Sequence, residues 1–216
     1  MNIITKDEND KYLLLDSTQK HQIMMEWEKP YMEACIQKLQ PFGDVLEIGF
    51  GLGYSATKIQ KFPINSYTII ECDENVYQKA LKWKENYNHT INIIFERWEN
   101  IYQTLPKFDC IFFDDYDIET LELCKVDSSI PCRNIDFIKK IKNNLKDYSR
   151  FSFYCALNKK NIKNYEIQWI HTLKNYWKNI DFQEYKANVP ENCRYIVDKS
   201  LYCPLIQIKK ILNYNL

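Results

Sequence analysis

The sequence predicts an α/β fold in which a mostly parallel, seven-stranded sheet carries helices on both faces. Three observations favour this class. Short apolar runs alternate with longer amphipathic stretches from about residue 44 onward. The four glycines of the chain fall within eleven residues, at the first predicted turn from strand to helix. Acidic residues follow the predicted strands at their carboxyl ends, which is where open parallel sheets bind ligands.

Five apolar runs have the length and composition of buried strands. Each is short and rich in β-branched or aromatic residues. Amphipathic stretches between them predict helices, and strands separated by helices imply right-handed βαβ crossovers, as in a Rossmann-like fold. The predicted strands cover residues 44–48, 67–71, 91–95, 108–113 and 151–155. The predicted helices lie near residues 54–61, 74–86, 133–146 and 161–178.

The two ends of the chain flank this unit. Residues 18–40 have a helical pattern, which Pro30 is expected to break or kink because proline disfavours helix at the preceding residue and lacks a backbone donor. The apolar runs 193–197 and 201–208 predict an antiparallel hairpin that completes the sheet. With no linker or repeat in view, we expect one domain over residues 1–216, made of an N-terminal helical segment (1–43) and a Rossmann-like core (44–216).

Composition excludes several classes of protein. The 29 Lys and Arg residues balance 29 Asp and Glu residues, so no overall charge attracts the chain to nucleic acid or to an anionic membrane. The N-terminus has no signal-peptide pattern, and no apolar run approaches the roughly 18 residues of a membrane-spanning helix. The eight cysteines include no Cys-x-x-Cys pair, which favours reduced thiols and no bound metal. We therefore expect a cytoplasmic protein, with the nucleus as an alternative.

The glycines after the first strand form the pattern Glu-x-Gly-x-Gly-x-Gly, beginning at Glu47. Glycine there allows positive φ angles and close approach of a ligand to the backbone. A dinucleotide-binding loop would need a further glycine where Tyr54 stands. The pattern is similar to motif I of class I methyltransferases, and this resemblance implies S-adenosylmethionine (SAM) as the cofactor. The turn would supply the cofactor contacts Gly49, Phe50, Gly51, Leu52, Gly53 and Tyr54.

The next two strands add further candidates for cofactor binding. Glu71 ends the second strand, at the position where a carboxylate can hold both ribose hydroxyls. Cys72 and Asp73 follow it. Arg97 and Trp98 follow the third strand, where an adenine would lie. Trp98 would either cover that ring or serve as a bulky core residue.

The fourth strand ends in an acidic cluster that begins with Asp114. Because ligands bind beyond the carboxyl ends of parallel strands, Asp114 is expected to face the methyl donor. Asp115 and Asp117 fit a helix cap or a solvated loop better.

The segment Met24-Met25-Glu26-Trp27-Glu28-Lys29-Pro30-Tyr31-Met32 resembles the signature that precedes motif I in guanidinoacetate N-methyltransferases. Relatives of that family include a fungal-type protein arginine methyltransferase. The matches run in order from about residue 20 to residue 208, nearly the whole chain. Further matching segments are 49–53, 69–73, 98–99, 108–109, 113–116, 137–139, 154–155 and 193–195.

The resemblance implies a SAM-dependent N-methyltransferase that acts on a guanidino group. Glu28 and Asp114 match the family carboxylates that grip the guanidinium, a planar cation whose N–H groups suit carboxylates in a fork geometry. Asp114 would accept the proton and Glu28 would orient the cation, or the roles would be reversed. Met24 and Met32 match positions that line the cofactor.

Three features bear on the acceptor. Asn158 and Lys159 stand where the family has a small hydroxyl-bearing pair beside the substrate carboxylate, so Lys159 would meet that carboxylate or stay exposed. Loop 116–132 is acidic, which suits a basic substrate such as a peptidyl arginine or simply a solvated loop. The family commonly folds its N-terminal segment over the site as a lid, a role that residues 1–43 would share.

These features leave several functions open. A guanidinoacetate-like small molecule is the leading acceptor, with a protein arginine as the alternative. An aminopropyltransferase shares the fold and also holds an amine with acids, and a non-catalytic SAM-binding module would need the cofactor site alone. The chain is expected to act as a monomer or homodimer.

Overall fold

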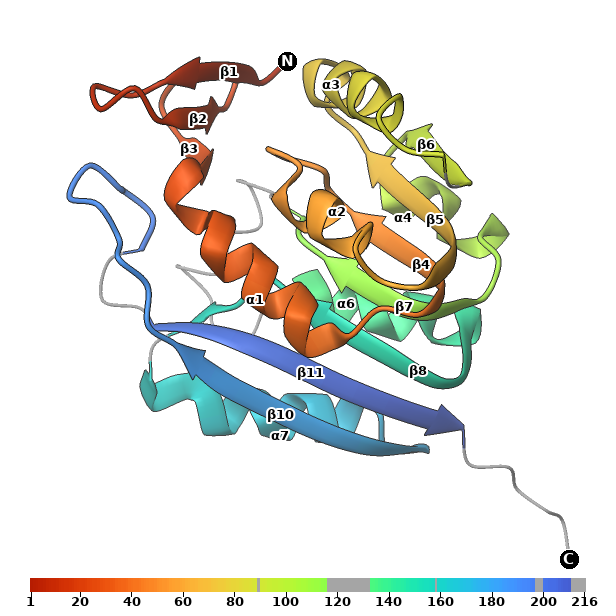
Figure 1. The fold of residues 1–216 in the computed structure, drawn as a ribbon. Coiled ribbons are helices and arrows are strands. Elements are labelled where there is room, and N and C mark those ends of the chain that lie inside the picture. The colour runs from red at the N-terminus through yellow and green to blue at the C-terminus, as the bar shows by residue number, and fades with distance from the viewer. Residues whose placement is uncertain (89, 116–132, 158, 197–199, 211–216) are drawn as a thin grey trace, which may run out of the picture.

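A mostly parallel sheet forms the centre of the protein, as the sequence predicts (Figure 1). The computed structural model describes residues 1–88, 90–115, 133–157, 159–196 and 200–210. The strand order is β10-β11-β8-β7-β4-β5-β6, and the short β9 pairs with β11 beside this path. Pairs among the inner strands β4 to β8 are parallel, whereas β11 runs antiparallel to β8 and β10. The strands are β4 (Gly43–Ile48), β5 (Ile64–Glu71), β6 (Ile91–Phe95), β7 (Phe108–Phe113), β8 (Leu145–Phe153), β9 (Ala156–Leu157), β10 (Tyr176–Tyr185) and β11 (Ser200–Lys210).

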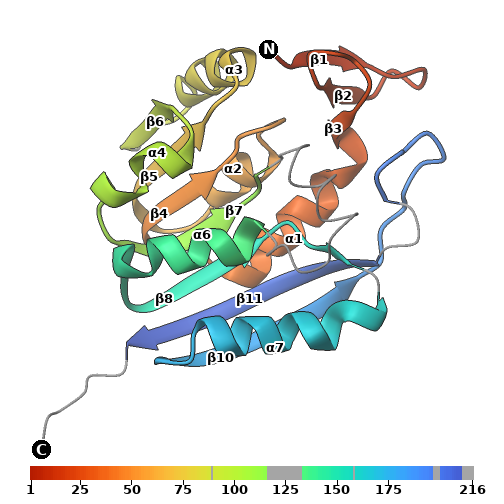
Figure 2. The same cartoon turned by 180° about the vertical axis from the view of Figure 1, so that it is seen from behind.

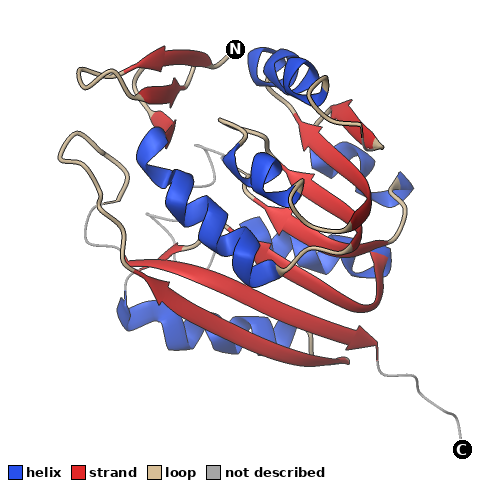
Figure 3. Ribbon diagram, in the orientation of Figure 1, coloured by secondary structure: helices blue, strands red, loops and turns tan. Residues whose placement is uncertain are grey.

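Helices cover both faces of this sheet. One face, toward the viewer in Figure 1, packs against α1 (Lys29–Leu39), α2 (Tyr54–Ile59) and α3 (Glu74–Lys84). The opposite face, toward the viewer in Figure 2, packs against α4 (Trp98–Ile101), α6 (Arg133–Ile141) and α7 (Ile162–Thr172). Figure 3 shows the resulting layers of helix, sheet and helix. Across the described ranges, no helix has both the length and the apolar character that crossing a membrane requires.

Strand β7 shows why these runs form a buried sheet. Cys110 and Phe112 pack in the cluster on the α1 face, whereas Ile111 and Phe113 pack in the cluster on the α6 face. All four side chains are at most 4% exposed. A strand segment covered on both faces is apolar at successive positions, and that is why residues 110–113 form a continuous apolar run.

The N-terminal segment differs from the prediction of a helical region over residues 1–43. A three-stranded antiparallel sheet precedes the first helix and consists of β1 (Ile3–Lys6), β2 (Tyr12–Leu15) and β3 (Gln22–Met25). The 3₁₀ turn η1 (Glu26–Glu28) follows, and α1 begins at Lys29. Pro30 lies in the first turn of α1, where its missing N–H has no helical partner to lose and its fixed φ suits the helix. It therefore marks the start of the helix and does not break one.

The C-terminal hairpin was predicted with the wrong partner strand. Strand β11 pairs with β10 (Tyr176–Tyr185), and residues 193–196 form no strand. The helix expected over residues 161–178 ends at Thr172, because the chain from Tyr176 onward forms strand β10. Ile180 and Phe182 pack on the core while the intervening Asp181 is exposed, which is the period-2 pattern of a half-buried strand.

Candidate active site

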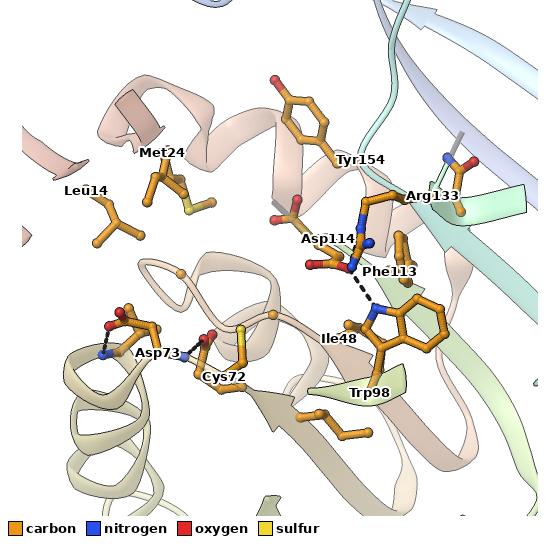
Figure 4. Close-up of a pocket in the computed structure, with 18 of the residues that line it drawn as sticks. Leu14, Met24, Ile48, Cys72, Asp73, Trp98, Phe113, Asp114, Arg133 and Tyr154 are labelled. Atoms are coloured by element: carbon orange, nitrogen blue, oxygen red, sulfur yellow. Dashed lines mark hydrogen bonds and ion pairs between the residues drawn. The ribbon is translucent and has the colours of Figure 1, made fainter. Parts of the chain in front are cut away.

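A cavity of about 510 Å³ opens at the carboxyl ends of the inner parallel strands (Figure 4). Its floor is formed where β4, β5, β7 and β8 end, and the N-terminal sheet contributes Leu14 and Met24 to the opposite wall. Backbone hydrogen bonds fix the floor, because Gly49 N–H donates to Ile70 O (2.9 Å) and Asp114 N–H donates to Ile48 O (2.9 Å). The location is the one expected for a ligand site in a parallel sheet, and the volume suits a nucleoside-sized ligand.

The predicted glycine loop forms one edge of the cavity. Gly49, Gly51 and Gly53 all have positive φ, at 80°, 52° and 81°. At Gly51 an added Cβ would lie 2.8 Å from the sulfur of Met24, a residue that also lines the cavity. The loop thus needs glycine both for its conformation and for the space that a side chain would fill.

Glu71 lies beside this loop at the end of β5 and is 7% exposed. Its carboxylate accepts hydrogen bonds from the backbone N–H of Phe50 (2.9 Å) and of Asp73 (2.8 Å), one on each oxygen. Burial raises the pKa of Glu71 despite these bonds. Each carboxylate oxygen keeps a second lone pair, so this side chain can still accept two hydroxyl hydrogens from a ribose.

The neighbouring residues Cys72 and Asp73 also line the cavity, as predicted for this strand end. Asp73 caps α3 by accepting from Val76 N–H (3.1 Å). Its second oxygen accepts from Asn2 N–H (2.6 Å), which joins the N-terminal sheet to this edge of the cavity. The contact with Asn2 was not predicted from the sequence.

Trp98 belongs to the hydrophobic core and also reaches the cavity. The ring lines the cavity and also packs edge-on against Phe137, with centroids 5.0 Å apart. The indole N–H donates to Asp115 Oδ2 (2.7 Å), and Arg133 binds the same oxygen through Nε (2.8 Å). Arg133 also pairs with Glu99 (2.7 Å). Asp115 therefore accepts hydrogen bonds from both Trp98 and Arg133 beside the predicted adenine position. The sequence favoured a helix cap or a solvated loop for this residue. Arg97, the other residue predicted here, lines the cavity as well.

Two carboxylates face the remaining part of the cavity, as predicted. Glu28, from η1, is 1% exposed, and burial together with the nearby Asp114 raises the pKa of Glu28 to about 8. Burial, with the Asp115 and Glu71 carboxylates, raises the pKa of Asp114 to about 7. Glu28 Oε1 accepts from Met25 N–H (2.8 Å), which fixes the carboxylate at the start of α1.

Two tyrosines border Glu28 and were not assigned a role from the sequence, although both fall in matching segments. The Tyr195 hydroxyl donates to Glu28 Oε1. Tyr154 follows β8 directly and lines the same cavity. The sequence did carry a signal for each. Tyr154 comes directly after a strand, and Tyr195 lies in the segment before the last strand.

Several predicted site residues do not line the cavity. Met32 is fully buried in the core cluster on the α1 face. Lys159 pairs with Glu184 (2.6 Å), and its side chain is 65% exposed. Asn158 lies outside the described residues, as does loop 116–132. Four more predicted cofactor residues belong to the glycine loop or begin the helix after it, and they do not line the cavity. They are Phe50, Leu52, Gly53 and Tyr54.

The residues present fit SAM. The glycine cradle leaves room beside the backbone, Glu71 offers free lone pairs to ribose hydroxyls, and Trp98 offers a flat apolar wall to an adenine. In the described part of the chain, no group of three or more His, Cys, Asp or Glu residues is arranged to hold a metal ion.

The fold and this site define a SAM-dependent methyltransferase of the Rossmann-like class. A family model described as guanidinoacetate N-methyltransferase matches residues 5–210, and the chain belongs to this family. The chain is 25% identical to a protein arginine N-methyltransferase 2 from Yarrowia lipolytica over 205 residues, which are 86% of this chain and 38% of that protein. The chain thus spans well under half the length of this curated relative.

Solved structures share the fold at low sequence identity. M. jannaschii TYW2, solved in complex with AdoMet, has a TM-score of 0.62 and 13% identity, covering 97% of this chain and 87% of that one. Spermidine synthase from Thermotoga maritima has a TM-score of 0.58 and 14% identity, covering 98% of this chain and 73% of that one. Both likenesses concern the fold alone, and it is the family match that favours methyl transfer over the aminopropyl transfer considered from the sequence.

Proposed function

We propose that the protein transfers a methyl group from SAM to a guanidino nitrogen, with a guanidinoacetate-like small molecule as the acceptor. The observation that carries this proposal is a pair of carboxylates, buried Glu28 and partly buried Asp114, in one largely apolar cavity beside the cofactor site. Two anions that are wholly or partly withdrawn from water in one cavity are costly unless a cation binds beside them or they take up protons. A guanidinium suits this pair, because its planar array of N–H donors matches carboxylate geometry.

The raised pKa values suit the chemistry of this acceptor. A guanidinium has a pKa above about 12, so its nitrogen must lose a proton as it attacks the methyl carbon. A carboxylate whose pKa lies near neutrality is a better proton acceptor than an ordinary one. We assign proton acceptance to Asp114 (pKa about 7) and orientation of the cation to Glu28, which Met25 and Tyr195 hold in place.

Methyl transfer exchanges a C–S bond for an N–C bond. The nitrogen lone pair forms the N–CH₃ bond, the C–S bond breaks with its electron pair on sulfur, and the proton passes to Asp114. When bound, SAM supplies the electrophilic methyl group and leaves as S-adenosylhomocysteine. The protein's contribution is alignment of the acceptor and exclusion of water.

A peptidyl arginine is the second candidate acceptor. The similarity to a fungal protein arginine methyltransferase favours it, since its side chain carries the same guanidinium. The two acceptors differ in what surrounds that group, because guanidinoacetate needs a partner for its own carboxylate. Lys159, the sequence candidate for that partner, pairs instead with Glu184.

The test is a transfer assay with methyl-labelled SAM. Wild type and Asp114→Asn are incubated with guanidinoacetate, arginine, putrescine and an arginine-rich protein extract in separate reactions. Asp136→Asn serves as the matched control, because Asp136 is a partly exposed carboxylate on α6 that pairs with Lys140. We expect label in guanidinoacetate for wild type and the control, and a loss of about 100-fold or more in Asp114→Asn.

Each other outcome has a distinct meaning. Label that enters only protein would move the acceptor to arginine residues. Label in putrescine would contradict guanidino specificity. Cofactor binding without transfer to any acceptor, or unchanged transfer in Asp114→Asn, would overturn the proposed reaction.

A further inference from the structure

The hydroxyl of Tyr154 is a buried polar group that lacks a hydrogen-bond partner among the described residues. A buried hydroxyl without a partner is costly, so its presence in a native protein calls for an explanation, such as a functional role or a water that binds it. The side chain lines the cavity that holds Glu28 and Asp114. Its neighbour Tyr195 differs, because the Tyr195 hydroxyl already donates to Glu28.

The backbone places Tyr154 in register with Asp114. Tyr154 N–H donates to Phe113 O (3.0 Å), just as Asp114 N–H donates to Ile48 O (2.9 Å). The two residues therefore follow neighbouring parallel strands, β8 and β7, at the same edge of the sheet. Ligands of open parallel sheets bind beyond these strand ends, and both residues line the cavity there.

The ring of Tyr154 is also held firmly. Tyr31 packs edge-on against it, with centroids 5.5 Å apart and ring planes at 89°. Tyr31 is itself fixed, because its hydroxyl accepts from Cys155 N–H (2.9 Å) and donates to Tyr202 O (2.8 Å). Such support keeps the Tyr154 oxygen in place with little loss of side-chain entropy when a ligand arrives.

The surroundings keep this hydroxyl protonated. Burial and the nearby Glu28 and Asp114 carboxylates raise the pKa of Tyr154 well above its ordinary value. Glu28 is near enough to act on the hydroxyl electrostatically, although the two groups do not meet in ordinary hydrogen-bond geometry. The group is thus a neutral hydroxyl beside two carboxylates, with an oxygen that can accept and a hydrogen that can donate.

We propose that Tyr154 is a third substrate-binding residue, whose hydroxyl oxygen accepts an N–H of the guanidino group that the two carboxylates leave unsatisfied. The inference rests on the proposed function. A guanidinium carries up to five N–H donors, and two carboxylates in fork geometry accept at most four. A fixed neutral oxygen completes the set without adding a third negative charge to the cavity. It also favours a guanidine over a simple amine, which offers fewer donors.

The experiment compares Tyr154→Phe with wild type and with Tyr185→Phe. Tyr185 packs against Tyr31 with centroids 5.4 Å apart and does not line the cavity, so it controls for loss of a tyrosine hydroxyl near the same ring. Three quantities are measured: the thermal midpoint, the affinity for S-adenosylhomocysteine, and the calorimetric affinity for guanidinoacetate with S-adenosylhomocysteine bound. An arginine peptide replaces guanidinoacetate if wild type binds only the peptide.

For Tyr154→Phe we expect an unchanged or higher thermal midpoint, because an unsatisfied hydroxyl has been removed. The affinity for S-adenosylhomocysteine should stay at the wild-type value, while the affinity for the guanidino ligand falls about 10- to 100-fold, as for loss of a hydrogen bond to a charged group. Tyr185→Phe should match wild type in all three.

A Tyr154→Phe variant that binds the guanidino ligand as wild type does would overturn the role of Tyr154 and leave the proposed function standing. If wild type binds neither guanidino probe, the proposed function and this inference fail together. A fall in S-adenosylhomocysteine affinity equal to the fall in guanidine affinity would show a general disturbance of the cavity and also overturn the specific role.

Discussion

Gly49 and Asp114 touch through their backbones, so that a Cβ atom on Gly49 would lie 2.1 Å from the carbonyl oxygen of Asp114. Asp114 N–H is bound to Ile48 O at the same place (2.9 Å). The positions of the first residue of the glycine loop and of the proposed proton acceptor therefore depend on one contact, where the chain leaves β4 and β7. The absence of a side chain at position 49 therefore sets the backbone position of Asp114 as well as the shape of the glycine loop.

Gly49→Ala should accordingly damage catalysis through the position of Asp114. The new methyl group must push the Asp114 carbonyl away, and the positive φ of 80° adds strain for any side chain. We expect a loss of about 100-fold in kcat, since displacements near 1 Å of a reacting group have effects of this size. Steady-state kinetics on the folded fraction measures it.

Gly43→Ala is the matched control. Gly43 has a φ of 63°, and a Cβ there would lie 2.1 Å from Asp109, but it stands at the opposite end of β4, away from the cavity. This variant should lose stability and keep kcat. Equal losses of kcat in both variants would contradict the connection between Gly49 and Asp114.

Glu71→Gln should weaken SAM binding by about 10- to 100-fold, the effect expected when hydrogen bonds to a charged acceptor are lost. Both oxygens of Glu71 accept backbone N–H groups, from Phe50 and Asp73, and a glutamine amide would place an NH₂ donor against one of those donors. Calorimetry with S-adenosylhomocysteine measures the change. Glu74→Gln, at the start of α3, is the control, and an affinity for Glu71→Gln equal to that of the control would refute the role.

The stability of the ligand-free protein should fall as pH rises from about 4.5 to 8. The pKa of Glu28 is about 8 in the folded protein against 4.5 ordinarily, so the folded state binds more protons than the unfolded state throughout this window. The free energy of unfolding then decreases with pH and levels off above the folded pKa. The loss from Glu28 alone is on the order of a few kcal/mol.

Glu28→Gln removes that titration. Its stability should equal or approach that of wild type near pH 5 and exceed it at pH 8.5, in urea unfolding followed by circular dichroism. A variant less stable than wild type at pH 8.5 would show that the ionised carboxylate stabilises the fold, which is the opposite of the expected effect.

The affinity for a guanidino ligand should increase with pH, whereas the stability of the free protein decreases. A cation needs ionised partners, and the raised pKa values of Asp114 (about 7) and Glu28 (about 8) leave these carboxyls largely protonated at pH 6 in the free protein. The affinity for guanidinoacetate is therefore expected to rise between pH 6 and pH 9, with uptake of the ligand releasing protons. Calorimetry in buffers of different ionisation enthalpy counts those protons, and a flat affinity over this range would contradict the proposal.

The strands and the cofactor loop were predictable because their signals are local. An apolar run such as Ile111-Phe112-Phe113 has to be buried on both faces, and four glycines in eleven positions indicate a turn that a ligand approaches closely. Asp114 and Glu71 followed from those strands, since the end of a parallel strand determines which edge of the sheet its next residue reaches.

The N-terminal sheet was not predictable by the same reasoning. Its strands have only four residues each, too few for a period to be established, and the side chains at Met24 and Met25 fit a helix as well as a strand. Proline posed a second ambiguity. A helix can end before a proline or begin with one, and the structure shows that the second applies to Pro30.

The rest of the site is formed by contacts between residues far apart in the sequence. Arg133 reaches Asp115 and Glu99, which precede it in sequence by 18 and 34 positions, so no local pattern pairs them. Tyr195 meets Glu28 across 167 positions. Met32 was assigned to the cofactor on resemblance, yet the inward face of α1 directs it into the core.

The lining of the cavity extends from Asn2 to Ile196. A ligand in the cavity therefore contacts segments from both the early and the late part of the sequence. A ligand that binds only the intact fold stabilises all of it by mass action. Resistance to a protease should then increase in both segments when the cofactor is bound. The rate of cleavage in either segment would therefore measure how much of the cavity is occupied.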